Sequence, residues 1–165
     1  MTQIEKELLL KDLCTRIPYG VVGKCEIDAS YDTSFDTIFQ THKFNAVVYG
    51  FKEDLLFVTP LIEDRDEQTF AEEEVADGVD ILDFTPYLFP LSSMTSEQLF
   101  EVQEILGKNE IEIGNGFLHI IDSDRNTITY LEILALLEWF YKNHFDIYGL
   151  IPMGLAIDAT NLVIY

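Results

Sequence analysis

The sequence has few cysteines and no long apolar segment. Two cysteines, Cys14 and Cys25, are too few for a four-cysteine zinc site; we expect free thiols in a reducing compartment, although a disulfide between them stays open. The N-terminal segment carries charges where a signal peptide needs its apolar run, which predicts a cytoplasmic protein. The longest uncharged apolar stretch, 147–157, has 11 residues. A membrane span needs about 20, so we expect no membrane association.

Basic residues are also scarce. The chain has 10 Lys and Arg against 30 Asp and Glu, a net charge of −20. Residues 1–52 hold seven acids and six bases, residues 105–165 hold eight acids and three bases, and residues 53–104 hold fifteen acids against Arg65 alone. Because nucleic-acid binding depends on Lys and Arg that neutralise phosphates, we expect no direct binding of nucleic acid.

The densest acidic part of the chain lies between residues 63 and 78. Such a run of like charges repels itself and favours solvent, so we expect an exposed loop or a frayed helical turn. Three interpretations stay open: a face that keeps the protein soluble, a surface that docks onto a basic protein as a mimic of DNA would, and a cation-binding site. The candidate partner-binding residues are Glu63, Asp64, Asp66, Glu67, Glu72, Glu73 and Glu74.

Length and composition predict an ordinary globular fold. A chain of 165 residues, 48% hydrophobic and 13% aromatic, can bury a sizeable core, so we expect one domain over 1–165. Its pattern predicts the α+β class, with a small antiparallel sheet and three helices. The helices are expected at 3–16, 96–106 and 130–143.

Local signals support each helix. In the first, Ile4, Leu9 and Leu13 form an apolar face, and Asp12 is expected on another face. The other two begin with capping boxes, Thr95 with Gln98 and Thr129 with Glu132. Helix 130–143 is apolar on most sides, which is typical of a core helix or of half an interface, and we favour the core.

Short runs rich in β-branched and aromatic residues predict the strands. A strand is expected at 21–27, and a hairpin is expected over 44–62 with a polar turn at 52–54. The segment 28–43 has no clear period and stays unassigned. Further strands are expected at 79–84, over 111–121 as a hairpin, and at 161–164.

A calcium-like pattern is the most specific chemical signal. Oxygen-bearing side chains alternate from Asp122 to Asn126, and a glutamate follows, as in an EF-hand loop. The run is one residue short, lacks the glycine of the sharp turn and follows a predicted strand, so a polar turn before a helix is the simpler interpretation. With two histidines, the candidate metal ligands are His119, Asp122, Asp124, Asn126, Glu132 and His144.

No motif of an established catalytic class is present. The chain lacks the GxSxG elbow, the P-loop and the HExxH sequence, so we expect no cofactor and no catalytic residue. We favour a non-enzymatic protein that acts through contact with a basic protein, of which a phage-type inhibitor would be one concrete form. The alternative is a metal-dependent hydrolase or a calcium-binding protein that uses the metal ligands above. The oligomeric state stays open.

Three segments carry a resemblance. LLLKDLCTRIPYGV at 8–21, PYLFPLSSMT at 86–95 and NHFDIYGLIPMGLAIDAT at 143–160 resemble uncharacterised proteins encoded by Bacteroides-type gut bacteria and their phages or prophages. The resemblance implies a bacterial or phage cytoplasmic origin and a role in phage–host biology. It implies no activity and transfers no residue role. Because the segments are apolar and contain Pro and Gly, they indicate a shared fold.

Overall fold

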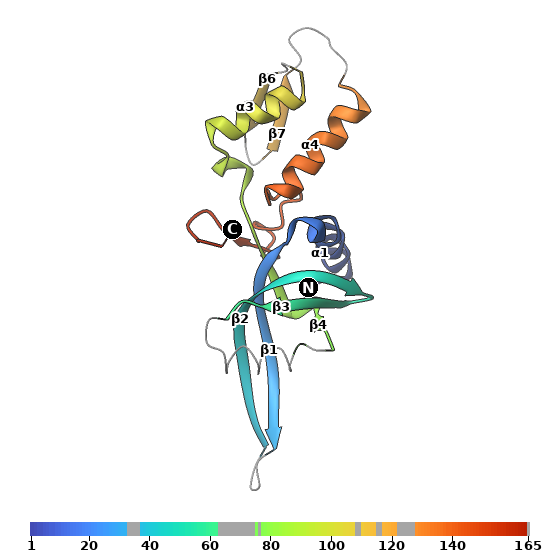
Figure 1. The fold of residues 1–165 in the computed structure, drawn as a ribbon, viewed down its shortest axis with the longest axis vertical. Helices are drawn as coiled ribbons and strands as arrows, with labels where there is room; N and C mark the ends of the chain where they lie inside the picture. The colour runs from blue at the N-terminus through green and yellow to red at the C-terminus, as the bar shows by residue number, and fades with distance from the viewer. Residues whose placement is uncertain are drawn as a thin grey trace. The chain divides into compact units, whose positions relative to one another are not determined.

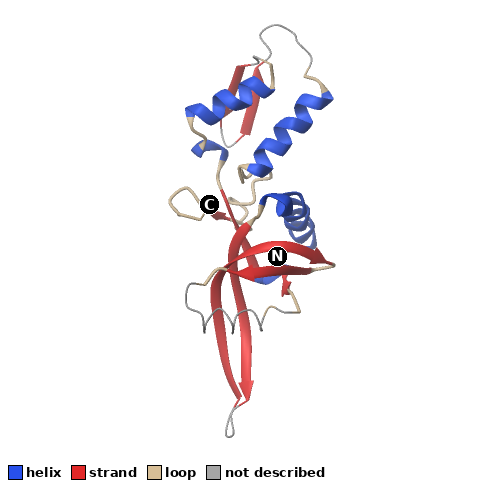
Figure 2. Ribbon diagram, viewed as in Figure 1, coloured by secondary structure: helices blue, strands red, loops and turns tan. Residues whose placement is uncertain are grey.

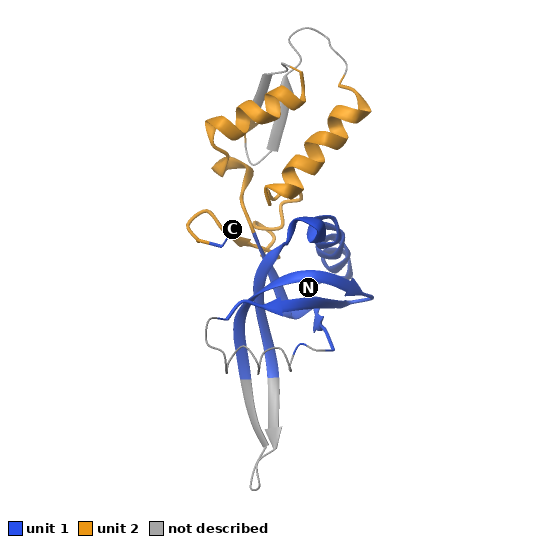
Figure 3. Ribbon diagram, in the orientation of Figure 1, with its two compact units in different colours: residues 1–87, 164–165 blue, residues 88–163 orange. Residues whose placement is uncertain are grey.

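The protein has the α+β fold that the sequence predicts, and the described part of the chain contains an antiparallel sheet and three α-helices (Figures 1 and 2). A computed structural model describes residues 1–32, 37–62, 75, 77–107, 110–114, 117–121 and 128–164, and it describes their side chains outside 29–32, 37–40, 110–112 and 117–121. The chain divides into two compact units (Figure 3). Unit 1 comprises residues 1–87 with 164–165, and unit 2 comprises residues 88–163.

Unit 1 begins with helix α1 (Gln3–Arg16), which has the predicted bounds. Its first turn is capped reciprocally: the Glu5 backbone N–H donates to the Thr2 hydroxyl at 3.3 Å, and the Thr2 N–H donates to the Glu5 carboxylate at 2.6 Å. A 3₁₀ turn, η1 (Ile17–Tyr19), follows the helix and ends at Gly20, whose φ is +74°. Glycine adopts this left-handed conformation without steric cost, so local sequence determines both ends of the helix.

The buried face of α1 carries an ion pair. Leu9, Asp12, Leu13 and Arg16 are each 0% exposed. Arg16 donates to Asp12 twice, from Nε to Oδ2 at 2.6 Å and from Nη2 to Oδ1 at 2.8 Å. Because the two residues are one helical turn apart, the helix itself presents the guanidinium to the carboxylate. The expected placement of Asp12 on a face other than the apolar one is therefore wrong, and Ile4, expected on the apolar face, is 77% exposed.

The sheet of unit 1 has the order β4-β3-β2-β1-β5. Its long hairpin pairs from Val22 opposite Val47 to Asp32 opposite Thr37, so strands occupy both ends of the unassigned segment 28–43. The hairpin predicted over 44–62 is confirmed by the pairing of β2 with β3. The elements are β1 (Val22–Asp32), β2 (Thr37–Lys52), β3 (Leu55–Pro60), β4 (Val79–Asp80), the 3₁₀ turn η2 (Ile81–Asp83) and β5 (Phe84–Leu88).

Strand register gives this sheet a buried face and a polar face. Cys25 and Ala46 are both 0% exposed, and they lie on the same side of β1 and β2 because side chains alternate along a strand. On β3, Val58 lies opposite Val48, and both are buried. The opposite face of the β1–β2 pair carries Lys24, Glu26, Lys43 and Asn45.

Strands β1 and β5 approach closely at Gly23. This glycine pairs with Pro86, and the aromatic ring of Phe84 lies against its Cα. A Cβ at this position would lie 2.7 Å from the Thr85 carbonyl oxygen and would overlap the Phe84 ring. The pairing of the two strands therefore requires a residue without a side chain.

Unit 2 confirms the predicted hairpin and the two capped helices. The Gln98 backbone N–H donates to the Thr95 hydroxyl at 3.3 Å, and the Thr95 N–H donates to the Gln98 side chain at 2.9 Å. Gly107 follows this helix at φ +67°. The elements of the unit are η3 (Leu91–Ser93), α3 (Ser96–Ile105), β6 (Glu110–Gly114), β7 (Phe117–Ile121), α4 (Tyr130–Lys142) and β8 (Ile157–Asp158).

The predicted strand at 161–164 is wrong, because the last strand, β8, lies earlier. The Ala159 N–H donates to the Leu88 carbonyl at 2.8 Å, which ends the extended pairing. The Asp158 carboxylate then accepts from the Thr160 N–H at 2.9 Å and from its hydroxyl at 2.6 Å. Such a bond from an aspartate to the backbone two residues later turns the chain.

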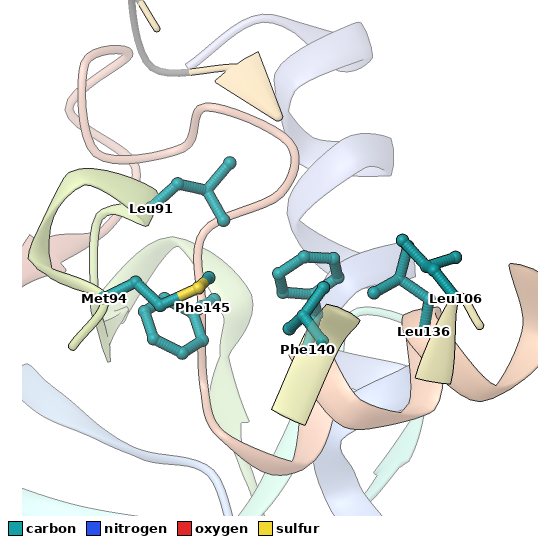
Figure 4. Close-up of a cluster of buried hydrophobic side chains, with 7 residues drawn as sticks. Leu91, Met94, Leu106, Leu136, Phe140 and Phe145 are labelled. Atoms are coloured by element: carbon teal, nitrogen blue, oxygen red, sulfur yellow. The ribbon is translucent and has the colours of Figure 1, made fainter. Parts of the chain in front are cut away.

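Apolar side chains from η3, α3 and α4 form the core of unit 2. Figure 4 shows part of this cluster, including Phe140, Phe145 and Leu136. Trp139 stacks on Phe145 with ring centroids 5.6 Å apart and an interplanar angle of 11°. The Trp139 Nε1 also donates to Glu101 at 2.8 Å, which joins α4 to α3. The aromatic stack thus holds the segment after α4 against that helix, and the contact with Glu101 joins α4 to α3.

Helix α4 buries only part of its apolar surface. Leu136 and Phe140 are 7% and 3% exposed, whereas Tyr130 and Leu131 are 73% and 75% exposed. Ile133 and Leu134, at 43% and 44%, are half-covered. The favoured assignment as a core helix therefore holds for the second half of α4 and is wrong for the first, because apolar composition alone does not fix which side is covered.

Removing one partner of the buried ion pair should destabilise unit 1. Arg16→Met leaves the Asp12 carboxylate buried without this guanidinium, and we expect the free energy of unfolding to fall by about 3–5 kcal/mol. The double variant Asp12→Leu/Arg16→Met removes both charges and should recover most of that loss. Urea denaturation measures both. As a control, Asp54→Asn breaks the 2.9 Å pair between the exposed Asp54 and the half-buried Lys6 and should cost less than about 1 kcal/mol. Equal losses in the single and double variants would contradict this account.

Adding one methyl group at Gly23 should also destabilise unit 1. Gly23→Ala forces Phe84 or β5 to move, and overpacking of this kind costs about 1–3 kcal/mol. Gly50→Ala is the matched control, because the nearest atom to its Cβ would be a Phe57 ring carbon at 3.7 Å. The control should stay within about 0.5 kcal/mol of wild type in the same denaturation experiment. Equal behaviour of the two variants would show that the close approach is relieved at no cost.

Candidate functional site

The seven acids predicted to bind a partner, within 63–74, lie outside the described residues. Beyond them in the same unit, the described acids are Asp77, Asp80 on β4 and Asp83 on η2. Partial burial, followed by the negative charges of Asp80 and Asp28, raises the pKa of the Asp83 carboxyl above its ordinary value of 3.8. Asp80 accepts from the Leu82 N–H at 2.9 Å, and Asp28 accepts from the Thr41 hydroxyl at 2.7 Å. The charges of Asp80 and Asp28 therefore each disfavour ionisation of Asp83.

The structure places two of the six predicted metal ligands and does not bring them together. Glu132 lies in the first turn of α4, where it accepts from the Thr129 N–H at 2.5 Å. His144 follows the end of the same helix, and at 1.5 Å per residue the two backbones are about 18 Å apart. One ion therefore cannot bind both. Outside the described residues lie the side chains of His119, Asp122, Asp124 and Asn126.

The metal-binding alternative stays a prediction. Among the described side chains, no group of three His, Cys, Asp or Glu residues could hold a metal ion. His144 itself is 6% exposed, and its carbonyl accepts from the Phe89 N–H at 2.9 Å. Nearby, the buried Asp146 carboxylate accepts from the Leu150 and Ile151 N–H groups, each at 2.8 Å. These contacts assign Asp146 to the framework of unit 2.

Unit 1 has a cavity on the polar face of its sheet. Its volume is about 320 Å³, and it lies where the chain leaves β3 beside β2. The Leu61 N–H donates to the Asn45 carbonyl at 2.7 Å, which holds the segment after β3 against β2. Three polar and three apolar residues line the cavity: Lys24, Lys43, Asn45, Phe44, Leu61 and Ile62.

Cross-strand register brings the two lysines of this cavity to one carboxylate. Lys24 lies opposite Asn45, and Glu26 lies opposite Lys43, so all four side chains share one face. The Lys43 Nζ lies 3.0 Å from one Glu26 oxygen, and the Lys24 Nζ contacts the other. Hydrogen bonds from Lys24 and then Lys43 lower the pKa of the Glu26 carboxyl, and the bond to Glu26 raises the pKa of Lys24. Two cations therefore share one anion.

A third polar group of the cavity is oriented from β5. The Tyr87 hydroxyl donates to the Asn45 Oδ1 at 2.8 Å. Burial raises the pKa of Tyr87, so the phenol stays protonated and remains a donor. Because the amide oxygen accepts this bond, the Asn45 NH₂ group points elsewhere with two donor hydrogens.

Sequence reasoning missed this cavity. Lys24 and Lys43 are far apart in the sequence, and Lys43 falls in the segment that carried no periodic signal. The alternation of Lys24 and Glu26 on β1 was visible, but on a half-buried strand such residues are normally only the solvent side. The register of β1 with β2 brings Lys24 and Lys43 together, and a single sequence does not reveal that register.

No protein-family model, curated protein or solved structure matches the chain. Among the described residues, no helix combines the length and hydropathy that a bilayer crossing requires. The chemistry of the described residues thus carries the functional argument, and it offers two features in unit 1: the carboxylates near η2 and the lysine cavity.

Neutralising Asp83 should stabilise the protein near pH 7. Its carboxyl has a raised pKa in the folded state, so ionisation at neutral pH disfavours folding; below the unfolded pKa the group is protonated in both states and the effect disappears. Asp83→Asn should therefore raise the urea midpoint at about pH 7 and leave it unchanged at about pH 3. Because most of the Asp83 side chain remains accessible to solvent, which screens the charge, the gain should be small. The exposed Asp77→Asn is the control, and an equal gain there would refute the repulsion between Asp83 and its neighbours.

Proposed function

We propose that the protein is a non-enzymatic module that binds a basic protein through the acidic surface of unit 1. By acidic surface we mean the acids within 63–74 together with Asp28, Asp80 and Asp83. The observation that carries the proposal is the charge imbalance of the segment 53–104, which has fifteen acids and one base. The charges of Asp80 and Asp28 add to partial burial in raising the pKa of Asp83. Lysine or arginine side chains of a partner would relieve that repulsion.

Scarcity of counter-charge within the chain supports the same function. Among the described acids of the segment 53–104, Asp54 alone forms an ion pair, with Lys6. The segment itself contributes one base, Arg65, against fifteen acids. Uncompensated charge of one sign creates a potential that steers an oppositely charged partner and increases its association rate.

The chemistry of the surface suggests which partner class would bind. Closely spaced carboxylates present negative charge as a nucleic-acid backbone does, so a protein with a phosphate-binding surface is the natural target. A phage-type inhibitor of a basic host protein is one concrete form, in keeping with the resemblance of residues 8–21, 86–95 and 143–160 to proteins of gut bacteria and their phages.

Charge neutralisation should abolish capture of basic proteins. Wild-type protein on a resin is expected to retain basic proteins from a bacterial lysate at about 0.1 M salt and to release them at about 1 M, where the Debye length falls from about 10 Å to about 3 Å. The variant Glu72→Gln/Glu73→Gln/Glu74→Gln, combined with Asp80→Asn and Asp83→Asn, should lose them. Quantitative mass spectrometry of the retained proteins measures the loss.

The control carries the same kind of change outside the acidic surface, with three positions in unit 2 and two on helix α1. Glu97→Gln, Glu104→Gln and Glu138→Gln neutralise three exposed helical acids, and Glu5→Gln with Glu7→Gln bring the total to the same five charges. This control should retain the same proteins as wild type. If both variants lose them equally, net charge and not the acidic surface governs binding, and the proposal is wrong.

A further inference from the structure

We infer that the cavity lined by Lys24, Lys43 and Asn45 is a binding site for a small monocarboxylate that has an apolar body. This site has the opposite charge preference to the acidic surface, although Asp28 lies on the same strand face two residues from Glu26, where it accepts from Thr41. Its ligand would place the carboxylate against the two ammonium groups and the Asn45 amide. The apolar body would lie against Leu61 and Ile62.

The polar side of the cavity has more hydrogen-bond donors than acceptors. Each lysine ammonium has three N–H donors, and Glu26 receives bonds from both lysines. The Asn45 amide adds two donors, because Tyr87 occupies its oxygen. A carboxylate accepts through two oxygens with about four lone-pair directions, so it complements this arrangement where a neutral or cationic group does not.

Local charge also favours an anion here, although the chain as a whole carries −20. Lys24 and Lys43 share the single carboxylate of Glu26, so the three side chains sum to one positive charge. Their side chains are 34%, 54% and 42% exposed, which leaves the ammonium groups accessible to a ligand. The acidic remainder of the protein disfavours a ligand with several negative charges, so a monoanion fits best.

The size and the apolar lining restrict the ligand further. A volume of about 320 Å³ lies at the lower end of the range for small-molecule sites. Leu61 and Ile62 supply the apolar side chains of the lining; Phe44 also borders the cavity, but its side chain lies on the other face of the sheet, opposite Cys25. A ligand with a short hydrocarbon or single-ring body would use this lining, whereas acetate would not.

Binding of 4-phenylbutyrate to the isotope-labelled full chain tests the inference. Titration followed by backbone amide NMR should shift Lys24, Lys43, Asn45 and Leu61, with a dissociation constant of about 1 mM. The neutral 4-phenylbutanamide tests the need for charge, and acetate tests the need for the apolar body. Each should bind at least about tenfold more weakly, a factor equivalent to about 1.4 kcal/mol.

Variants should change the affinity in both directions. Lys43→Met and Asn45→Asp should each weaken binding about tenfold, because they remove donors, and aspartate still accepts from Tyr87. Glu26→Gln should strengthen binding about tenfold, because it releases both ammonium groups from a competing carboxylate. A gain in affinity cannot come from misfolding, so this variant keeps the test decisive.

Two matched controls separate the site from net charge. Lys52→Met changes the net charge as Lys43→Met does, on the same strand but outside the cavity, and Asp77→Asn matches Glu26→Gln. Both should leave affinity within about twofold of wild type. The inference is overturned if 4-phenylbutyrate leaves the four amides unshifted, if the amide analogue binds equally well, or if each variant matches its control. None of these outcomes bears on capture of basic proteins by the acidic surface.

Discussion

The antiparallel register of β1 with β2 is the constraint on which unit 1 depends. It sets Gly23 opposite Ala46 and Lys24 opposite Asn45, so one face is buried and the other is polar. A slip by one residue would move every side chain of a strand to the opposite face. Cys25 would then face solvent, and its thiol, whose pKa burial raises to about 12, would lose the apolar environment that keeps it protonated. The core and the lysine cavity therefore depend on the same strand register.

The few basic residues of unit 1 occur in two kinds of charge arrangement, a buried ion pair and a surface cluster. Arg16 is fully buried with Asp12, where a two-point contact compensates for removal of both groups from water. On the sheet surface, two lysines meet one glutamate, so positive charge remains in excess there. Cations used in these places are not available to the acids near η2. The uneven distribution of ten bases thus produces a local cationic site and an uncompensated acidic surface in the same unit.

The sequence predicts what is decided locally. The capping boxes at Thr95 and Thr129 specify helix starts, because residues three apart in the sequence form the hydrogen bonds to the backbone N–H groups at the start of the helix. A charged residue on the buried face of a helix misleads prediction from the sequence. Asp12 is predicted to lie away from the core unless its pairing with Arg16, one turn later, is considered. Helix α4 misleads in the opposite way, because its apolar residues outnumber those that the core covers. The cavity was not predicted, because it depends on strand register. Of the candidate metal ligands, Glu132 and His144 lie near opposite ends of α4, which their residue types alone do not indicate.

The two proposed sites of unit 1 are separable by electrostatics. A basic partner meets the summed potential of many exposed carboxylates, which acts over distances comparable with the Debye length and is therefore screened by salt. A monocarboxylate in the cavity makes short contacts with Lys24 and Lys43, and partly buried contacts are screened less. For that ligand, salt also screens the repulsion from the rest of the chain. Added salt should therefore weaken binding of a basic protein. For the monocarboxylate, salt screens both the attraction to the lysines and the repulsion from the remaining acids, and these two effects have opposite signs. A protein with a net charge of −20 can thus bind both kinds of ligand.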